Sequence, residues 1–204
     1  MNKTAKILAT LLIFTTLVLF LLKRRVSSVS LIPLKDLGFD ENQKQSIDLI
    51  SKEWDRVGDG DKRKLAYILA TVMVESRMGR YMYELGERSY FNRYEGRSDL
   101  GNTQTGDGYK YRGRGFVQIT GRNNYDKFSK ILGIDLVNNP DLAARKDIAV
   151  KILIKGMIEG KFTRRKLSDY FNSSTNDPCG ARRIVNGDSC VKARDYYYQY
   201  YKLI

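Results

Sequence analysis

The stretch from Gly106 to Tyr125, which reads GDGYKYRGRGFVQITGRNNY, decides the fold that we expect for this chain. Its five glycines allow sharp backbone turns and let a ligand approach the backbone closely. A tight turn at residues 113–115 precedes the run FVQIT, a pattern typical of a turn that leads into a short strand. Gln118 and Thr120 would then share one face of that strand. The stretch therefore predicts either a polar ligand-binding face over an apolar floor, or an ordinary basic hairpin with structural glycines.

The N-terminal region contains an uncharged segment, residues 7–22, followed by three cations at positions 23–25. Sixteen residues at about 1.5 Å each span roughly 24 Å, a little less than the ~30 Å hydrocarbon core of a bilayer. Lysines near the N-terminus can snorkel to complete the span. We therefore expect residues 1–25 to be a transmembrane anchor or signal-anchor. The alternative is a signal peptide cleaved at the small residues 28–30, which the preceding cations disfavour.

Charge and length limit the remaining possibilities. A net charge of +13 indicates anionic surroundings such as nucleic acid, an anionic membrane or the carboxylate-bearing peptides of a bacterial wall. We expect no nucleic-acid partner, because no basic helix of regular spacing is present. Residues 26–40 indicate a linker with a short docking segment, and residues 41–204 are long enough to form one domain with a sizeable core. The sequence does not indicate an oligomeric state.

Capping residues and apolar periodicity predict a mainly helical domain. Asp40 would cap a helix over residues 41–57, and Asp61 would cap a second helix over residues 62–78. Two further helices are expected at residues 125–132 and 148–158, a last short one after Thr163, and an aromatic C-terminal run that packs on the core.

Glu75 lies on the apolar stripe of the second expected helix, three residues after Val72 and seven after Ile68. Desolvation raises the pKa of a carboxyl group on an apolar face, which suits a general acid that works near neutral pH. The alternative is a glutamate at the end of a helix that bends out to solvent.

The chain resembles glycoside hydrolase family 19, the chitinase-type enzymes of the lysozyme-like superfamily, from about residue 64 to residue 201. The resemblance is to the bacterial and phage branch more than to the plant chitinases. It implies a mainly α (α+β lysozyme-like) fold of two helical lobes with a small β-hairpin and a central cleft. It rests on separated motifs in the family's order: ILATVMVES (68–76), YELGERSYFNRY (83–94), LGNTQTGDGYKYRGRGFVQITGRNNY (100–125), NPDLA (139–143), KLSDYF (166–171), DPCGARRIVNG (177–187) and ARDYYYQYY (193–201).

The resemblance implies a pair of catalytic carboxylates. Glu75 matches the family's general acid, and Glu84 matches its general base, with Glu87 and Glu95 as rivals for that second role. Thr120 matches the residue that helps to position the attacking water. The implied mechanism is inverting, for which a carboxyl separation of about 6.5–9.5 Å leaves room for the water.

The resemblance also implies substrate-binding residues. Gln118 and Asn124 match sugar-binding amides, and Asn186 matches an asparagine that binds substrate in the cleft, although Asn-Gly is also an ordinary turn signal. Arg194 matches an arginine that supports the catalytic region. Tyr111 would stack on a sugar ring, with packing in the core as the alternative.

The chain departs from the family at Val74, where a histidine is common, and it contains no histidine at all. Histidine-based catalysis and histidine metal sites are therefore excluded. Two cysteines without histidine do not indicate zinc, and we expect no metal or cofactor. Cys179 and Cys190 are either a disulfide, in an oxidising compartment, or two free thiols.

Together these features predict a membrane-anchored, peptidoglycan-degrading glycoside hydrolase, either an endolysin or a virion-associated lysin. It would be a single-pass protein of the host inner membrane with its domain in the periplasm, or of a virion membrane, held through residues 7–22. It would cleave β-1,4 bonds between N-acetylated amino sugars. The alternatives are a chitinase acting on chitin oligomers, a catalytically inactive module that binds cell walls, and a membrane-tethered nucleic-acid binder.

Overall fold

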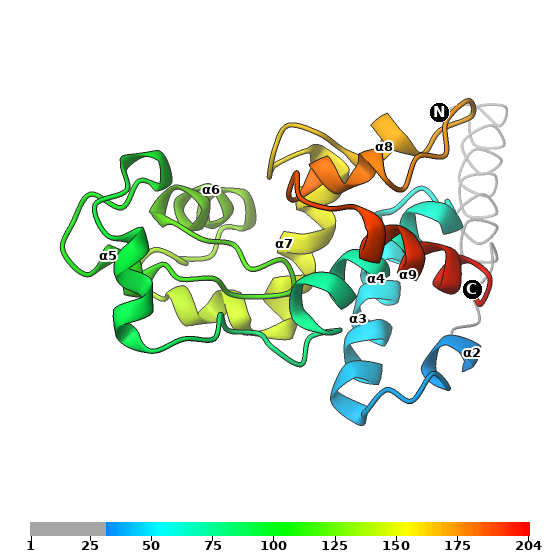
Figure 1. The fold of residues 1–204 in the computed structure, drawn as a ribbon, viewed down its shortest axis with the longest axis horizontal. Helices are drawn as coiled ribbons and strands as arrows, with labels where there is room; N and C mark the ends of the chain where they lie inside the picture. The colour runs from blue at the N-terminus through cyan, green and yellow to red at the C-terminus, as the bar shows by residue number, and fades with distance from the viewer. Residues whose placement is uncertain (1–31) are drawn as a thin grey trace, which may run out of the picture. The chain divides into compact units, whose positions relative to one another are not determined.

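The computed structural model describes residues 32–204, and within that range the chain is helical and contains no β-strand (Figure 1). The α-helices are α2 (Ile32–Lys35), α3 (Glu41–Val57), α4 (Lys62–Ser76), α5 (Asp107–Lys110), α6 (Arg122–Leu132), α7 (Lys146–Glu159), α8 (Leu167–Tyr170) and α9 (Val191–Tyr201). The 3-10 helices are η1 (Arg88–Tyr94), η2 (Ser98–Leu100), η3 (Pro140–Ala144) and η4 (Gly180–Ile184).

The two N-terminal helices of the domain begin where the sequence predicts. Asp40 and Gln43 form a reciprocal capping box at the start of α3. The carboxylate of Asp61 accepts a hydrogen bond from the first turn of α4. The Asp61 cap sets the start of α4 at the predicted residue. The helix ends at Ser76, two residues before the predicted end at residue 78, because the chain turns there.

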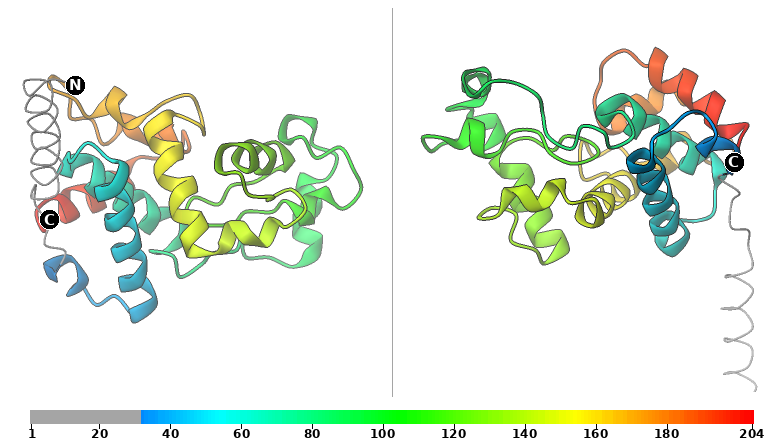
Figure 2. Two further views of the ribbon diagram at one scale, coloured as in Figure 1. Left: turned by 180° about the vertical axis from the view of Figure 1, so that it is seen from behind. Right: turned by 90° about the horizontal axis from the view of Figure 1, so that it is seen from below.

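One side of the molecule is a larger lobe of α3, α4, α7, α8 and α9. Helix α4 packs along α9, α3 packs against α7, and α7 also contacts α8. Figures 1 and 2 show these helices gathered together on that side. The predicted apolar stripe of α4 is buried, and the C-terminal tyrosines pack on it as expected, since the ring of Tyr197 lies 6.4 Å from that of Tyr67.

The other side of the molecule is a smaller lobe built from η1, η2, α5 and α6. Helix α5 packs on η1, and α6 contacts η2. Phe91 and Phe128 are buried in this lobe. Helix α6 ends at Gly133, whose φ of 66° is the left-handed conformation that closes many helices.

The predicted β-hairpin is wrong. Residues 113–120 form no strand in the described chain, and only isolated bridges join Arg114 to Ile119 and Tyr83 to Arg114. Gln118 has φ of 52°, a left-handed conformation that interrupts a strand and breaks its alternation of faces. The buried side chain of Arg114 holds the loop instead, because it bonds to the backbone oxygens of Lys110 and Arg112 and pairs with Asp141.

The prediction of a membrane-spanning helix is also corrected. Across residues 32–204, no helix is both long enough and apolar enough to cross a membrane. Even the strongly apolar α7 has only 14 residues, about 21 Å, and carries lysines. This finding contradicts the predicted single-pass anchor. The predicted location at a membrane depended on that anchor and is wrong too. The segment on which they were based, residues 7–22, lies outside the described residues.

Candidate active site

Glu75 occupies the last turn of α4, in the larger lobe. The helix stops directly after it because Arg77 and Met78 both adopt left-handed backbone conformations, with φ of 51° and 56°. The Ser76 hydroxyl accepts a hydrogen bond from Gly79 N–H and stabilises this turn. The Glu75 side chain keeps 16% of its surface exposed, so a ligand can reach it.

The partner of Glu75 is a buried arginine, not the apolar surroundings that its helical position predicts. Arg182, in η4, is 3% exposed and places Nη1 2.5 Å from Glu75 Oε1. At this distance the two charged groups are partners of each other, so the buried guanidinium and the Glu75 carboxylate form an ion pair. The guanidinium thus orients the Glu75 carboxylate.

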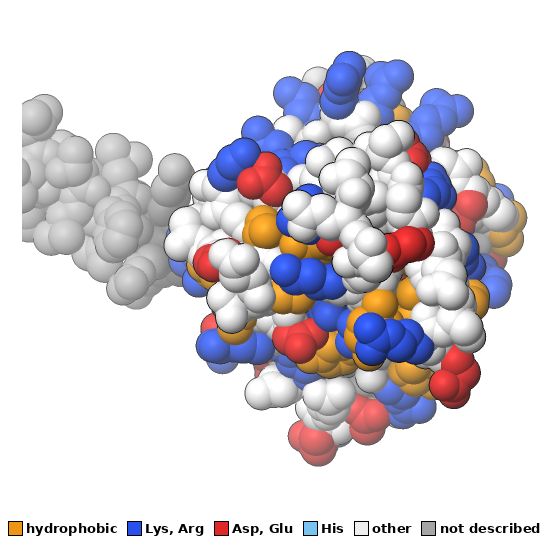
Figure 3. Space-filling model, turned by 90° about the vertical axis from the view of Figure 1, so that its left-hand side faces the viewer, with side chains coloured by type: hydrophobic (Ala, Val, Ile, Leu, Met, Phe, Trp, Pro, Cys, Tyr) orange, Lys and Arg blue, Asp and Glu red, His pale blue; other side chains and the backbone are white. Residues whose placement is uncertain are grey.

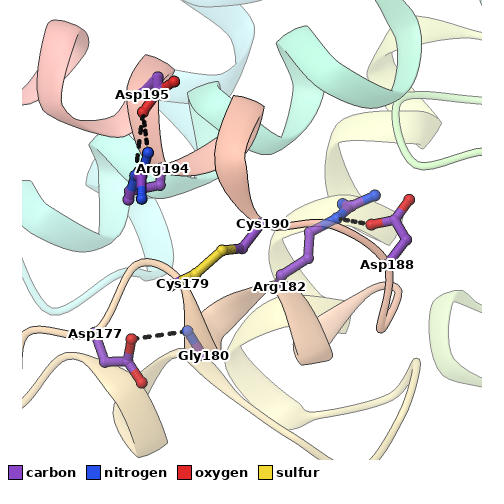
Figure 4. The surroundings of a disulfide bond; sticks show 8 residues. All are labelled: Asp177, Cys179, Gly180, Arg182, Asp188, Cys190, Arg194 and Asp195. Atoms are coloured by element: carbon purple, nitrogen blue, oxygen red, sulfur yellow. Dashed lines mark hydrogen bonds and ion pairs between the residues drawn. A yellow bond between two sulfur atoms is a disulfide. The ribbon is translucent and has the colours of Figure 1, made fainter.

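Arg182 also pairs with Asp188, since its Nε lies 2.5 Å from Asp188 Oδ1 (Figure 4). Burial lowers the pKa of Arg182, but the hydrogen bond to Asp188 and the charge of Glu75 outweigh that effect, so the pKa is raised. The guanidinium is thus a permanent cation shared by two carboxylates.

A disulfide between Cys179 and Cys190 closes the loop that carries Arg182 and Asp188 (Figure 4). The disulfide alternative of the sequence prediction is therefore the one observed. Asn186 lies in the same loop and is exposed, and its backbone N–H donates to Arg182 O at 3.0 Å. Asn186, the predicted substrate-binding asparagine, is thus hydrogen-bonded through its backbone to Arg182, which contacts Glu75.

Glu84 lies in the segment that enters the smaller lobe, and three donors hold its carboxylate. Oε2 accepts from Gly113 N–H at 2.9 Å, and Oε1 accepts from the Tyr94 hydroxyl at 2.8 Å and from Arg93 at 3.2 Å. The side chain is 18% exposed, close to the value for Glu75. Its orientation is therefore fixed while its surface stays accessible.

The two rival glutamates differ from Glu84. Glu95 accepts hydrogen bonds from Gly106 N–H at 2.5 Å and from Gly108 N–H at 2.8 Å, so both of its oxygens hold the loop before α5. Glu87 precedes η1 and is exposed. Glu84 is thus the one of the three that is both oriented by its neighbours and half-buried.

The other predicted polar residues form a chain beside Glu84. A Cβ atom on Gly113 would lie 2.9 Å from both Gln118 Oε1 and Glu84 Oε2, which places the two side chains on the same side of this glycine. The Thr120 hydroxyl donates to Gln118 O at 3.0 Å, and the Asn124 amide donates to Thr120 O at 2.8 Å. The structure therefore brings these residues together, in a loop and not on a strand face.

One predicted substrate-binding residue is wrong, and the role of Arg194 stays a prediction. Tyr111 is fully buried, donates its hydroxyl proton to Val137 O, and packs on the ring of Tyr125, so it cannot stack on a sugar. Arg194 pairs with its exposed neighbour Asp195, as Figure 4 shows.

The residues that sequence reasoning missed are Arg182, Arg93 and Tyr94. The sequence does not distinguish Arg182 from its exposed neighbour Arg183, because both lie between the two cysteines. The contacts of Arg93 and Tyr94 with Glu84 depend on 3-10 geometry that has no clear sequence pattern. Among the described residues, no group of three or more acidic or cysteine side chains could hold a metal ion.

Part of the chain is similar to known proteins. Residues 72–158 match the family model of chitinase class I, glycoside hydrolase family 19. A glycosyl hydrolase family 19 domain-containing protein of Haemophilus influenzae is 46% identical over 61 residues, which are 30% of this chain and 30% of that protein. An endochitinase of Arabidopsis thaliana is 33% identical over 133 residues, 65% of this chain and 42% of that protein. The chain thus spans less than half the length of these two relatives.

Solved structures share the fold. Chitinase C from Streptomyces griseus superposes with a TM-score of 0.58 at 19% identity, covering 86% of this chain and 91% of that one. A bacterial family 19 chitinase gives a TM-score of 0.55 at 21% identity, covering 86% and 94%. The predicted resemblance is confirmed over residues 72–158, which match glycoside hydrolase family 19, and the solved structures show that the fold is shared.

Proposed function

We propose that this protein hydrolyses the β-1,4 bond next to an N-acetylated amino sugar, with Glu75 as general acid and Glu84 as general base. One observation carries the proposal. Two half-buried carboxylates, 16% and 18% exposed, sit on different lobes, and each is oriented by its own set of charged or polar neighbours. Paired carboxylates on opposite sides of a glycosidic bond are what this hydrolysis requires.

The proposed steps assign one proton transfer to each carboxylate. Glu75 protonates the leaving oxygen, and Glu84 removes a proton from the attacking water. The Thr120 hydroxyl donates its proton to Gln118 O, so its lone pairs remain free to accept a hydrogen bond from that water. We propose an inverting outcome, in which the water attacks the face of the sugar opposite the leaving group.

Two amides are suited to different tasks in this scheme. Asn186 is exposed beside Arg182 and can bind hydroxyl or acetamido groups of the substrate. The Asn124 amide nitrogen donates to Thr120 O and its oxygen accepts from Lys127, so it supports the Thr120 loop.

We further propose peptidoglycan as the substrate, as for an endolysin or a bacterial wall-remodelling enzyme, because a charge of +13 suits a polymer that carries carboxylates. Chitin is the second candidate, and the names of the relatives, which are endochitinases, favour it. Both polymers present the same bond chemistry to Glu75 and Glu84.

The test compares the parent with Glu75→Gln and Glu84→Gln on purified peptidoglycan and on chitin oligomers, with products identified by mass and by reducing end. Glu87→Gln, an exposed glutamate near Glu84, is the matched control. We expect both active-site variants to lose most activity and the control to retain it. A parent that binds but cuts neither polymer would overturn the hydrolase proposal and leave a wall-binding module.

A further inference from the structure

The loop between α7 and α8, residues 160–166 with sequence GKFTRRK, carries a dense group of cations. We call it the basic loop. Arg164, Arg165 and Lys166 are all exposed, and Arg183 of η4 is exposed beside it. Figure 3 shows Lys and Arg side chains gathered along the upper edge of the molecule, the side on which Figure 1 places α8.

The basic loop is firmly held. The ring of Phe162 lies 5.6 Å from that of Phe128 in α6, and it also packs directly on Gly156 of α7. The Thr163 hydroxyl donates to the backbone oxygens of Arg183 and Ile184, at 2.5 and 3.1 Å. Phe162 packs against α6 and α7, and Thr163 is hydrogen-bonded to η4. The backbone that carries the cations is therefore fixed.

Arg164 has φ of 71°, a left-handed conformation that is costly for any residue other than glycine. A glycine at this position would avoid the strain. The Arg164 N–H donates to Gly160 O at 3.0 Å, so this conformation belongs to a hydrogen-bonded turn that fixes the backbone of the basic loop.

One carboxylate lies beside these cations, since Asp169 Oδ2 accepts a hydrogen bond from Lys166 N–H at 3.0 Å, but the four cations outnumber it. Nearby ion pairs use other residues, since Glu159 pairs with Lys155 and Lys161, and Asp188 pairs with Arg182. Within residues 32–204, Arg164, Arg165, Lys166 and Arg183 take part in no ion pair. An uncompensated group of this size attracts an anionic ligand.

The basic loop also connects the two ends of the candidate site. Lys127 Nζ donates to Lys161 O at 3.0 Å and to Asn124 Oδ1 at 3.1 Å, which joins the loop to the Thr120 side. Burial and the charge of Lys161 lower the pKa of Lys127. Through Thr163 the loop joins η4, which leads into Asn186. A glycan bound beside Thr120 and at Asn186 would therefore lie alongside the cations.

We propose that the basic loop binds the carboxylates of the stem peptides on a peptidoglycan strand, so that the site selects peptide-bearing glycan over neutral glycan. Guanidinium groups pair with carboxylates in a bidentate manner, and lysine adds a point charge. Neutral chitin offers no group for these cations. The inference rests on the proposed function and identifies the feature of the substrate that the protein recognises.

The test uses the full chain and the triple variant Arg164→Gln, Arg165→Gln, Lys166→Gln. The matched control removes three exposed lysines elsewhere, Lys52→Gln, Lys151→Gln and Lys202→Gln. Each protein is assayed for co-sedimentation with insoluble peptidoglycan, and for kcat/KM on peptidoglycan and on chitin oligomers, which are neutral. Each assay is run at low and at high salt.

We expect the triple variant to bind peptide-bearing glycan about tenfold more weakly, a size consistent with three exposed ion pairs, with a flatter salt dependence and less than twofold change on neutral glycans. The control should match the parent. Equal losses on all glycans, or no loss on peptidoglycan, would overturn the inference. Because co-sedimentation does not require hydrolysis, a parent that binds but does not cut would refute the proposed function and leave the inference testable.

Discussion

The surroundings of Glu75 and of Glu84 differ in the number and kind of groups that orient the carboxylate. Glu75 stands on a helix and faces one buried cation, Arg182, which comes from a distant part of the chain. Glu84 stands in an irregular segment and receives three donors, two from η1 and one from Gly113. The first arrangement depends on a single long-range contact, and the second divides the work among three contacts, of which those from Arg93 and Tyr94 are local.

This difference predicts how each region responds when a residue that contacts the carboxylate is substituted. Removing the one partner of Glu75 leaves buried charges uncompensated, which is costly. Removing one donor from Glu84 leaves the other two in place. We therefore expect the Glu75 region to be fragile and the Glu84 region to be tolerant, and the following experiments test that contrast.

The largest effect should come from the carboxylates themselves. Glu75→Gln and Glu84→Gln should each lower kcat by about 10²–10⁴-fold, the usual contribution of general acid or base catalysis. The two roles are separated with a substrate whose leaving group needs no protonation, such as a nitrophenyl glycoside. Glu75→Gln should recover much of its activity on that substrate. Equal recovery by Glu84→Gln would mean that the roles are wrongly assigned.

Arg182→Gln should have the next largest effect. It leaves Glu75 and Asp188 without their shared cation, so the free energy of unfolding should fall by about 3–5 kcal/mol in chemical denaturation. Arg194→Gln is the control, because Arg194 is half-exposed and its ion pair within residues 32–204 is with the exposed Asp195. Its loss should stay within about 1 kcal/mol. Similar losses for the two variants would show that Arg182 is not a special support of Glu75.

Loss of the disulfide should destabilise the same region by a smaller amount. Opening the loop between Cys179 and Cys190, which are 11 residues apart, should cost about 2–3 kcal/mol of unfolding free energy, since the unfolded chain regains entropy. The double variant Cys179→Ser, Cys190→Ser should therefore melt at a lower temperature than the parent. It should also be insensitive to reductant, whereas the parent should lose the same stability when reduced. A parent that melts alike with and without reductant would contradict this.

The same contrast explains what the sequence could and could not predict. Asp40, Asp61 and the apolar stripe before Glu75 are local signals, and each was interpreted correctly because capping and helical periodicity act over a few residues. The pairing of Glu75 with Arg182 joins distant segments, and no local pattern records it.

The error at residues 113–120 has a different cause. Alternating apolar and polar residues predicted a strand, but the left-handed conformation at Gln118 turns the chain there. A residue other than glycine at positive φ cannot be anticipated from its own identity. Tyr111 illustrates the same limit, because an aromatic residue among glycines fits a sugar platform and a buried core equally well.

Gly113→Ala tests the Glu84 region by steric means. The added Cβ would lie 2.9 Å from Glu84 Oε2 and from Gln118 Oε1, so the carboxylate must move. We expect kcat to fall about tenfold with little change in stability, because small displacements of a catalytic group are costly to rate. Gly187→Ala, in the disulfide-closed loop that carries Arg182, adds a Cβ that meets no atom within 4 Å and should be neutral. If Gly113→Ala is neutral as well, Gly113 does not set the position of Glu84.

Tyr94→Phe should give the smallest effect and the sharpest test of tolerance. It removes the hydroxyl that donates to Glu84 Oε1, while Arg93 still reaches that oxygen and Gly113 N–H still holds Oε2. Since two of three donors remain, we expect kcat to fall only about two- to fivefold, less than the full value of a hydrogen bond to a charged group. Tyr90→Phe is the control, because Tyr90 contacts Arg93 through its ring, which the substitution keeps. A loss from Tyr94→Phe as large as that from Glu84→Gln would mean that the hydroxyl takes part in the chemistry, and that the Glu84 region depends on a single partner just as the Glu75 region does.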